Sequence, residues 1–231
     1  MQHILDNMIW NAITTGNKDI ATVNGNVGCY HPAISPFAGL KESRWSNEDL
    51  QELYEFLAAG SRVVVSREER MIPDEKKWKV RQQMDICQMV YDRPVDGFTT
   101  TASSLISPLT FEHVPQMLEL TKLTKPGPFS EKTILFGNYF GIFIDERLAA
   151  MTGQRMHPIP YMEVSAVCTH PDFRGKGYAK ALMLHVMKII LDNSFIPFLH
   201  VLTNNSGAIQ LYESIGFLTR KKLFVDVIQR L

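Results

Sequence analysis

The clearest pattern of hydrophobic and polar positions lies in the second half of the chain. Three segments place apolar side chains three and four positions apart, which is typical of amphipathic helices: residues 110–124, 177–193 and 206–217. Four others are rich in β-branched and aromatic residues and predict strands: residues 138–156, 161–170, 196–204 and 221–229. The first of these reads as a hairpin that turns near Asp145–Glu146. The predicted order of elements is β-α-β-β-β-α-β-α-β.

The first half of the chain mixes both patterns. Residues 46–60 predict a helix that begins at Ser46, and residues 61–66 and 79–91 predict strands. Between the halves, residues 92–108 collect Pro, Gly, Ser and Thr, and the apolar periodicity lapses. We therefore expect an α/β protein with an N-terminal subdomain over residues 1–104 and a second domain over residues 105–231.

Composition and charge narrow the class of protein. Of the 231 residues, 45% are hydrophobic, and 24 Lys and Arg balance 24 Asp and Glu, which is typical of an ordinary globular protein. The chain shows no basic-aromatic stripe, no apolar run of ~18 residues and no secretory signal. We expect a cytoplasmic protein that binds neither nucleic acid nor membrane. The three scattered cysteines argue against a disulfide framework, and the histidines lack zinc spacing, so we expect no metal.

A glycine-containing stretch, "HPDFRGKGYAKA" over residues 170–181, is the strongest chemical signal. The P-loop pattern fails because Gly177, not Ser or Thr, follows Lys176, and the dinucleotide pattern fails at Lys180. The pattern R-x-x-G-x-G/A between a strand and a helix fits Arg174, Gly177 and Ala179. Small residues at a helix start let backbone N–H groups approach a pyrophosphate. From these residues alone, an anion site and a plain tight turn are equally open.

Two sequence motifs, in the right order along the chain, indicate which ligand this stretch binds. "EVSAVCTHPDFRGKGYAKALM" and, downstream, "NNSGAIQLYESIGF" resemble the two signatures of the GNAT acetyltransferase superfamily. The resemblance covers about residues 106–231 and implies a mixed, mostly antiparallel sheet flanked by helices. It is closest to a bacterial-type branch with a divergent N-terminal portion, which we expect to be a degenerate half of the same fold.

The resemblance also implies how acetyl-CoA is held. The backbone N–H groups that take the pyrophosphate would belong to Gly175, Lys176, Gly177, Tyr178 and Ala179, with added positive charge from Arg174 and Lys176. The backbone of Val167, Cys168 and Thr169 would pair with the pantetheine arm. Asn205 would contact the same arm, and its alternative or additional role is a helix N-cap.

In such enzymes an amine attacks the thioester directly, which implies roles for catalytic residues. A strand N–H near Val167 would stabilise the oxyanion, and Tyr212 would protonate the leaving thiolate unless it is a core tyrosine. Glu163 lies four residues before Val167, hence on the same face by strand alternation, and is the candidate general base. Its alternative is a salt bridge, and His200 is a weaker candidate base.

The acceptor is the least defined part. We expect a small-molecule or peptide amine and a monomer or homodimer. Acceptor specificity would come from the loop of residues 124–129, the hairpin around residues 151–156 and the N-terminal domain. Two alternatives stay open. One is transfer of another acyl group, as in glycine N-acyltransferase relatives, and the other is an inactive CoA-binding sensor module.

Overall fold

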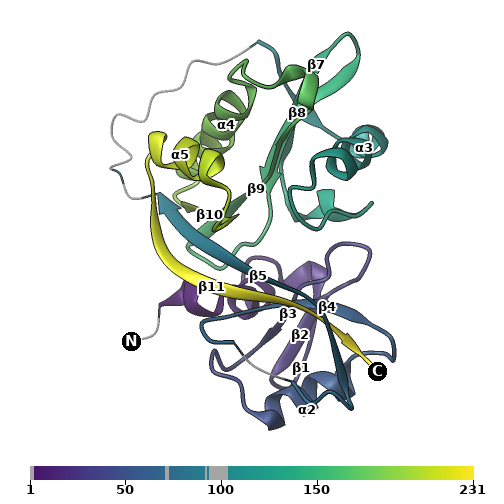
Figure 1. Cartoon of the computed structure of the whole chain (residues 1–231). Helices are drawn as coiled ribbons and strands as arrows, with labels where there is room; N and C mark the ends of the chain where they lie inside the picture. Colours follow the sequence, from purple (N-terminus) through teal and green to yellow (C-terminus); the bar gives the residue numbers. More distant parts are fainter. Residues whose placement is uncertain (1–2, 71–72, 92, 94–103) are drawn as a thin grey trace.

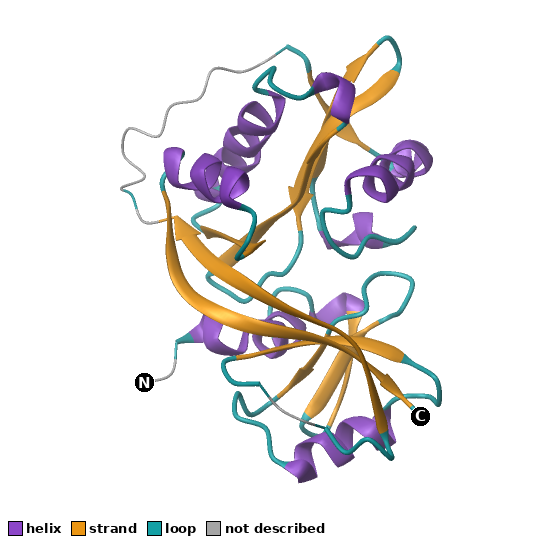
Figure 2. Ribbon diagram, in the orientation of Figure 1, coloured by secondary structure: helices purple, strands orange, loops and turns teal. Residues whose placement is uncertain are grey.

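An eight-stranded sheet organises the molecule in the computed structural model, which describes residues 3–70, 73–91, 93 and 104–231 (Figures 1 and 2). The strand order is β4-β11-β5-β10-β9-β8-β7-β6, and a second sheet has the order β1-β2-β3. Within the large sheet every neighbouring pair is antiparallel except β9 and β10. Helices flank the large sheet, so the predicted fold class is confirmed.

The second half of the chain follows the predicted order of elements. Its strands and helices are β6 Ile106–Leu109, α3 Val114–Thr124, β7 Tyr139–Ile144, β8 Arg147–Gln154, β9 Tyr161–Thr169, α4 Tyr178–Asp192, β10 Ile196–Leu202, α5 Ser206–Ser214 and β11 Phe217–Arg230. Apolar residues of α4 and α5 pack on one face of the sheet, and those of α3 pack on the other. The helices therefore bury the apolar stripes that predicted them.

The first half of the chain supplies a helical and a sheet layer of its own. Its elements are α1 Met8–Thr14, β1 Ala21–Asn24, β2 Val27–Tyr30, β3 Ala38–Leu40, α2 Asn47–Phe56, β4 Arg62–Arg67 and β5 Trp78–Tyr91. The predicted helix begins at Ser46, whose hydroxyl accepts from the Asp49 N–H while the Asp49 carboxylate accepts from the Ser46 N–H. This capping box satisfies backbone donors that the helix start would leave unpaired.

Two strands of 14 residues each, β5 and β11, run through both halves of the molecule (Figure 1). They pair antiparallel from Tyr91 with Phe217 to Trp78 with Arg230, and β5 also pairs with β10. Sheet hydrogen bonds thus cross the division expected at residue 104. Most of the segment that suggested that division, residues 92 and 94–103, lies outside the described residues, and the division stays a prediction.

Candidate active site

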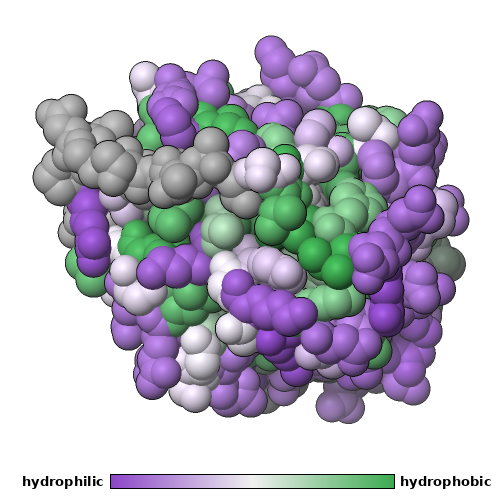
Figure 3. All heavy atoms as spheres, turned by 90° about the horizontal axis from the view of Figure 1, so that it is seen from above, coloured by the Kyte–Doolittle hydropathy of each residue, from purple (hydrophilic) through white to green (hydrophobic). Residues whose placement is uncertain are grey.

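The glycine stretch forms the connection from β9 to α4. A 3-10 turn spans Pro171–Phe173, and Gly175 and Gly177 follow with φ of 77° and 78°. A Cβ on either glycine would meet nothing within 4 Å, so backbone conformation, not crowding, calls for glycine there. The first N–H groups of the 15-residue helix α4 have no partner within the helix and carry the positive end of its dipole. Figure 3 shows the end of the molecule at which α4 begins, with polar side chains around its rim and apolar ones in its middle.

Strands β9 and β10 separate as they approach this loop. Their parallel pairing covers only Tyr161–Glu163 against Ile196–Phe198. Further along, both strands are fully described and neither has a register partner in the other, while their outer edges still pair with β8 and β5. The two inner edges therefore border an opening in the middle of the sheet, with unpaired strand backbone along it.

A bulge interrupts β9 beside this opening. Met151 pairs with Cys168 and Gly153 pairs with Ser165, so two residues of β9 lie opposite Thr152. Ala166, one of the two, has a left-handed φ of 52°. The extra residue leaves backbone groups out of the ladder with β8. The bulge thus places free backbone polar groups at the edge of the opening.

The bulge also reverses the alternation of side chains along β9. Val164 and Val167 pack in the cluster of α4 and α5, whereas Ala166 and Cys168 pack in the cluster of α3. Glu163, adjacent to Val164 before the bulge, therefore does not share a face with Val167. The expected shared face was wrong, because period-two alternation holds only in an uninterrupted strand.

Tyr212, on α5, lies in an apolar cluster that also includes residues of both separated strands. It belongs to the cluster that contains Val164 of β9 and Leu199 and Val201 of β10, and it is 8% exposed. Its hydroxyl has no hydrogen-bond partner among the described residues. Burial, with a smaller effect of Cys168, raises the pKa of Tyr212 to about 12, so the phenol stays protonated at neutral pH. Tyr212 thus offers a protonated hydroxyl, unpaired among the described residues, as a hydrogen-bond donor near the opening.

Asn205 is the N-cap of α5. Its side-chain oxygen accepts a hydrogen bond from the Ala208 N–H at 3.2 Å. The structural alternative for this residue is therefore confirmed. The amide nitrogen makes no hydrogen bond within the described residues, and the contact of Asn205 with the CoA arm stays a prediction.

Cys168 is buried on the α3 side of β9. Burial raises the pKa of its thiol to about 12, so the thiolate is not populated at neutral pH. A nucleophilic role for this sulfur is therefore disfavoured. The predicted pairing of the Cys168 backbone with a CoA arm does not involve the thiol and stays a prediction.

Glu163 is fully buried in a polar cluster with Arg155 and His200. Arg155 donates from Nε to Oε2 at 2.8 Å and from Nη2 to Oε1 at 2.6 Å, and His200 Nδ1 lies 2.7 Å from Oε1. Burial alone would raise the pKa of Glu163, but Arg155 and then His200 stabilise the carboxylate and lower the pKa to about 2. The salt-bridge alternative is what the structure contains, and the catalytic role of Glu163 stays a prediction.

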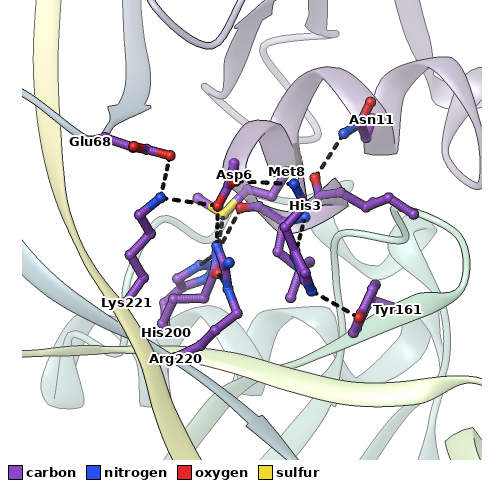
Figure 4. Close-up of polar contacts among 12 residues, drawn as sticks. His3, Asp6, Met8, Asn11, Glu68, Tyr161, His200, Arg220 and Lys221 are labelled. Atoms are coloured by element: carbon purple, nitrogen blue, oxygen red, sulfur yellow. Dashed lines mark hydrogen bonds and ion pairs between the residues drawn. The ribbon is translucent and has the colours of Figure 1, made fainter. Parts of the chain in front are cut away.

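The cluster continues from His200 toward the N-terminal segment, as Figure 4 shows. The Gln88 amide nitrogen lies 3.1 Å from His200 Nε2 and 3.1 Å from the Leu5 carbonyl oxygen. The Gln88 oxygen accepts from Arg220 Nε at 2.7 Å, and Arg220 Nη2 donates to Asp6 at 2.5 Å. Five elements contribute to this network, and no sequence motif announced it.

These contacts assign the state of His200. Arg220 can only donate, so the Gln88 oxygen must face it and the Gln88 NH₂ group must face His200. His200 Nε2 therefore accepts, and Nδ1 carries the proton that it donates to Glu163. We assign His200 as the neutral Nδ1–H tautomer, and the cluster of Arg155, Glu163 and His200 then has no net charge.

The loop of residues 124–129 closes a small pocket against the bulge. The pocket is lined by Pro126, Gly127, Pro128, Phe129, Thr133, Tyr139, Arg155, Ser165 and Ala166. The loop and the hairpin segment that were expected to define the acceptor site thus meet at one place, beside Ala166.

No three His, Cys, Asp or Glu side chains among the described residues converge as metal ligands would. None of the helices seen in these parts of the chain has the length and apolar character that crossing a bilayer requires.

Known proteins share this architecture. A family model described as "FR47-like protein" matches residues 139–225. A solved structure described as an acetyltransferase from the GNAT family of Novosphingobium aromaticivorans is 31% identical, with a TM-score of 0.90 over 100% of both chains. The GCN5-related N-acetyltransferase from Kribbella flavida, 9% identical with a TM-score of 0.60 over 96% of this chain and 95% of that one, shares the fold.

A curated relative has a named activity. The [ribosomal protein bS18]-alanine N-acetyltransferase of Salmonella typhimurium is 29% identical over 119 residues, which are 48% of this chain and 79% of the relative. The 31% sequence identity to the Novosphingobium protein, over the full length of both chains, shows that this chain belongs to the GNAT family. It is an acyltransferase of the N-acetyltransferase type, as the two sequence motifs predicted, and membership implies acetyl-CoA as co-substrate.

Proposed function

We propose that this protein transfers the acetyl group of acetyl-CoA to a primary amine by direct attack in a ternary complex. The observation that carries the proposal is the opening between β9 and β10. The helix start with its two glycines lies at one end of β9, the bulge at Ala166 lies beside the opening, and Tyr212 belongs to the apolar cluster that contains residues of both strands.

Binding of the co-substrate is assigned to backbone more than to side chains. The N–H groups from Gly175 to Ala179 take the pyrophosphate, and the exposed cations of Arg174 and Lys176 complement its charge. The inner edge of β9 over Val167–Thr169 pairs with the pantetheine arm as an added strand would. The free amide nitrogen of Asn205 donates to the arm while its oxygen caps α5.

The chemistry needs donors at two places. As the amine attacks, negative charge develops on the thioester oxygen, and a backbone N–H freed by the bulge at Ala166–Val167 stabilises it. When the C–S bond breaks, the Tyr212 hydroxyl donates to the thiolate. With a pKa of about 12 the phenol is a weaker acid than an ordinary tyrosine, so its main contribution is the hydrogen bond to the leaving sulfur.

No described residue is an evident base for removing the proton from the amine. A carboxylate with a pKa of about 2 is a poor base, and both of its oxygens already accept hydrogen bonds. We therefore assign Glu163 as a positioning residue that holds Arg155 and His200. The acceptor then binds as the neutral amine or loses its proton to water.

The acceptor is an amine of a small molecule or a peptide. The Salmonella relative is named for a protein amine, the alanine of ribosomal protein bS18, which favours a peptide for this chain as well. The proposal places the reaction in the cytoplasm, in a monomer or homodimer.

Two measurements on the purified protein test the proposed function. Acetyl-CoA is expected to raise the melting temperature, and a panel of primary amines is expected to include at least one that releases CoA thiol. No shift with acetyl-CoA would remove the co-substrate assignment. A shift without turnover by any amine would favour the inactive CoA-binding module, and turnover only with longer acyl-CoA would favour another acyl group.

A further inference from the structure

The pocket beside the bulge contains a buried hydroxyl without a partner. Tyr139 is 2% exposed, and its hydroxyl makes no hydrogen bond in the described part of the chain. Leaving such a group unpaired costs about 1–3 kcal/mol, which an incoming ligand can recover. The Tyr139 ring lies 5.8 Å from the Phe129 ring, measured between centroids, and packs directly against Gly153, where a Cβ would leave it no room. These contacts fix the position of the hydroxyl.

Arg155 adds a second unpartnered donor to the same pocket. Its Nε and Nη2 are bound to Glu163, and its guanidinium lies 4.9 Å from the ring centroid of Phe37. The remaining nitrogen, Nη1, makes no hydrogen bond within the described residues and lies 3.8 Å from where a Cβ on Gly127 would be. It therefore faces the Pro126–Pro128 loop, with its plane fixed by the other two nitrogens.

The charge around these donors selects the kind of oxygen that they bind. Arg155 and Glu163 cancel, and His200 is neutral by its hydrogen bonds. A carboxylate in the pocket would leave one net negative charge buried without a counterion. A neutral carbonyl oxygen takes both donors without that cost.

We propose that this pocket binds the carbonyl oxygen of an acceptor whose amine is on the neighbouring carbon, as in the N-terminal residue of a peptide or an amino acid amide. The inference rests on the proposed function, because Ala166 lines both the pocket and the reaction centre. An oxygen held by Tyr139 and Arg155 is then a few bonds from the attacking nitrogen.

The scarcity of a strong base supports the same class of acceptor. An α-amine has a pKa of about 7.7–8.0, whereas an alkyl amine such as that of lysine has a pKa of about 10.4. Near pH 8 the α-amine is largely neutral without help from the protein. Among the described residues around the pocket, the only buried carboxylate is that of Glu163, which Arg155 binds. An amine beside a carbonyl suits such a site, because it needs no strong base.

Three acceptors of similar size test the inference at saturating acetyl-CoA: L-alaninamide, L-alanine and isopropylamine. Rates are compared per neutral amine, so that differences in amine pKa cancel. We expect kcat/KM for alaninamide to exceed that for either of the others by at least about tenfold, because a site built to hydrogen-bond a group discriminates against analogues that lack it.

A matched pair of variants assigns the preference to this pocket. Tyr139→Phe is expected to lower kcat/KM for alaninamide about tenfold through KM, and to leave isopropylamine turnover and acetyl-CoA affinity unchanged. Its melting temperature should rise, because the variant lacks the buried hydroxyl that has no partner in the described part of the chain. Tyr30→Phe is the control, because the Tyr30 hydroxyl is also buried near Arg155 and Glu163 but is bound to Asn17 outside the pocket. It is expected to leave the ratio of alaninamide to isopropylamine as it is in the parent protein.

The outcomes separate this inference from the proposed function. Equal kcat/KM for alaninamide and isopropylamine, a preference for alanine, or an unchanged ratio in Tyr139→Phe would overturn the inference while acetyl transfer stands. Binding of acetyl-CoA with no turnover of alaninamide would overturn it too. If acetyl-CoA does not bind at all, the proposed function fails and this inference fails with it.

Discussion

The carboxylate of Glu163 shows how one residue changes its chemistry with its surroundings. On an exposed strand it could serve as a base, but here it is fully buried and receives hydrogen bonds from Arg155 and the Met156 N–H, with His200 beside it. Burial works against its charge, and Arg155 outweighs burial, so the pKa falls to about 2. The same contacts that ionise the group make it a weak proton acceptor.

Glu163→Gln is expected to destabilise the fold by about 3–5 kcal/mol at pH 7, because it leaves the charge of Arg155 buried without a counterion. In the parent protein the Glu163 pKa falls from 4.5 to about 2 on folding. The ion pair therefore stabilises the fold fully above pH 4.5, and this contribution, about 3 kcal/mol, is lost as pH falls toward 2. Urea unfolding at pH 7, 5 and 3 measures both effects.

The variant should consequently lose less stability than the parent between pH 5 and pH 3. Glu112→Gln, at an exposed position, is the control and should follow the parent. Parallel pH curves for the parent and Glu163→Gln would show that this carboxylate is not the group that titrates.

Tyr212→Phe tests the proposed donor to the leaving thiolate. Removing a hydroxyl without a partner preserves packing, so we expect kcat to fall about 100-fold and the acetyl-CoA Kd to stay within about twofold. Steady-state kinetics measures kcat, and isothermal titration calorimetry measures the acetyl-CoA Kd. Tyr54→Phe, on α2, should change neither, and an equal loss of kcat and affinity in Tyr212→Phe would make Tyr212 a packing residue.

At the scale of elements, the connection from β9 to α4 combines three devices in sequence. The bulge at Ala166 frees backbone groups, the separation from β10 exposes an edge of β9, and two glycines at positive φ present the start of α4. Each device leaves backbone donors or acceptors unused by the protein itself. An unused backbone edge is a place for a ligand to pair, since buried polar groups that lack partners cost free energy.

Gly177→Glu is expected to weaken acetyl-CoA binding by at least about 100-fold, because it places a carboxylate where the pyrophosphate would lie. Gly60→Glu is a closely matched control. Gly60 has φ of 77° and open space around a Cβ, as Gly177 does, but lies in the N-terminal half. Both variants should lose a similar stability, of the order of 1 kcal/mol. Equal acetyl-CoA affinity in the two variants, measured by titration, would refute the assignment of the loop.

At the scale of the molecule, strands from both halves make one sheet. β5 lies between β10 and β11, and the network from Glu163 through His200, Gln88 and Arg220 reaches Asp6 in the N-terminal segment. The buried cluster of Arg155, Glu163 and His200 is therefore oriented by residues from the first half of the chain. This couples the position of Arg155 to the packing of both halves.

A fragment of residues 105–231 is expected to lack a cooperative thermal transition and to gain no stability from acetyl-CoA. Without β5, strands β10 and β11 lose their common partner, and Gln88 is missing from the buried network. Near-ultraviolet circular dichroism and a melt with and without acetyl-CoA provide the measurement, with the full chain as control. A cooperative melt that acetyl-CoA shifts would instead establish two autonomous domains divided near residue 104.

Local signals explain how far the sequence predicts the fold. The helix at Ser46 has a complete capping box, and Asp145 and Glu146, both with positive φ, form the tight turn expected between β7 and β8. The glycines at 175 and 177 are required by their own backbone conformation. Features of this kind depend on neighbours in the chain, so they can be predicted without knowing the rest of the fold.

Other parts of the site depend on contacts that distant residues make. Nothing distinguishes Ala166 from an ordinary strand residue, so the bulge and the change of face that follows could not be predicted. Arg155, His200 and Gln88 come together only because β9, β10 and β5 are neighbours. The sequence therefore predicted the glycine-containing turn from β9 to α4, but not the buried cluster of Arg155, Glu163 and His200.

The position of β5 has a consequence for how the protein is made. On a ribosome that adds about 5–20 residues per second, β5 is complete roughly 6–25 seconds before the first residue of β11 appears, 126 residues later from Tyr91 to Phe217. Until β10 begins at Ile196, the 14-residue strand has neither of its neighbours in the finished sheet, and strand edges of this kind associate readily with other chains. The newborn chain should therefore need chaperones to keep this strand from associating with other chains until β11, the last strand, completes the sheet.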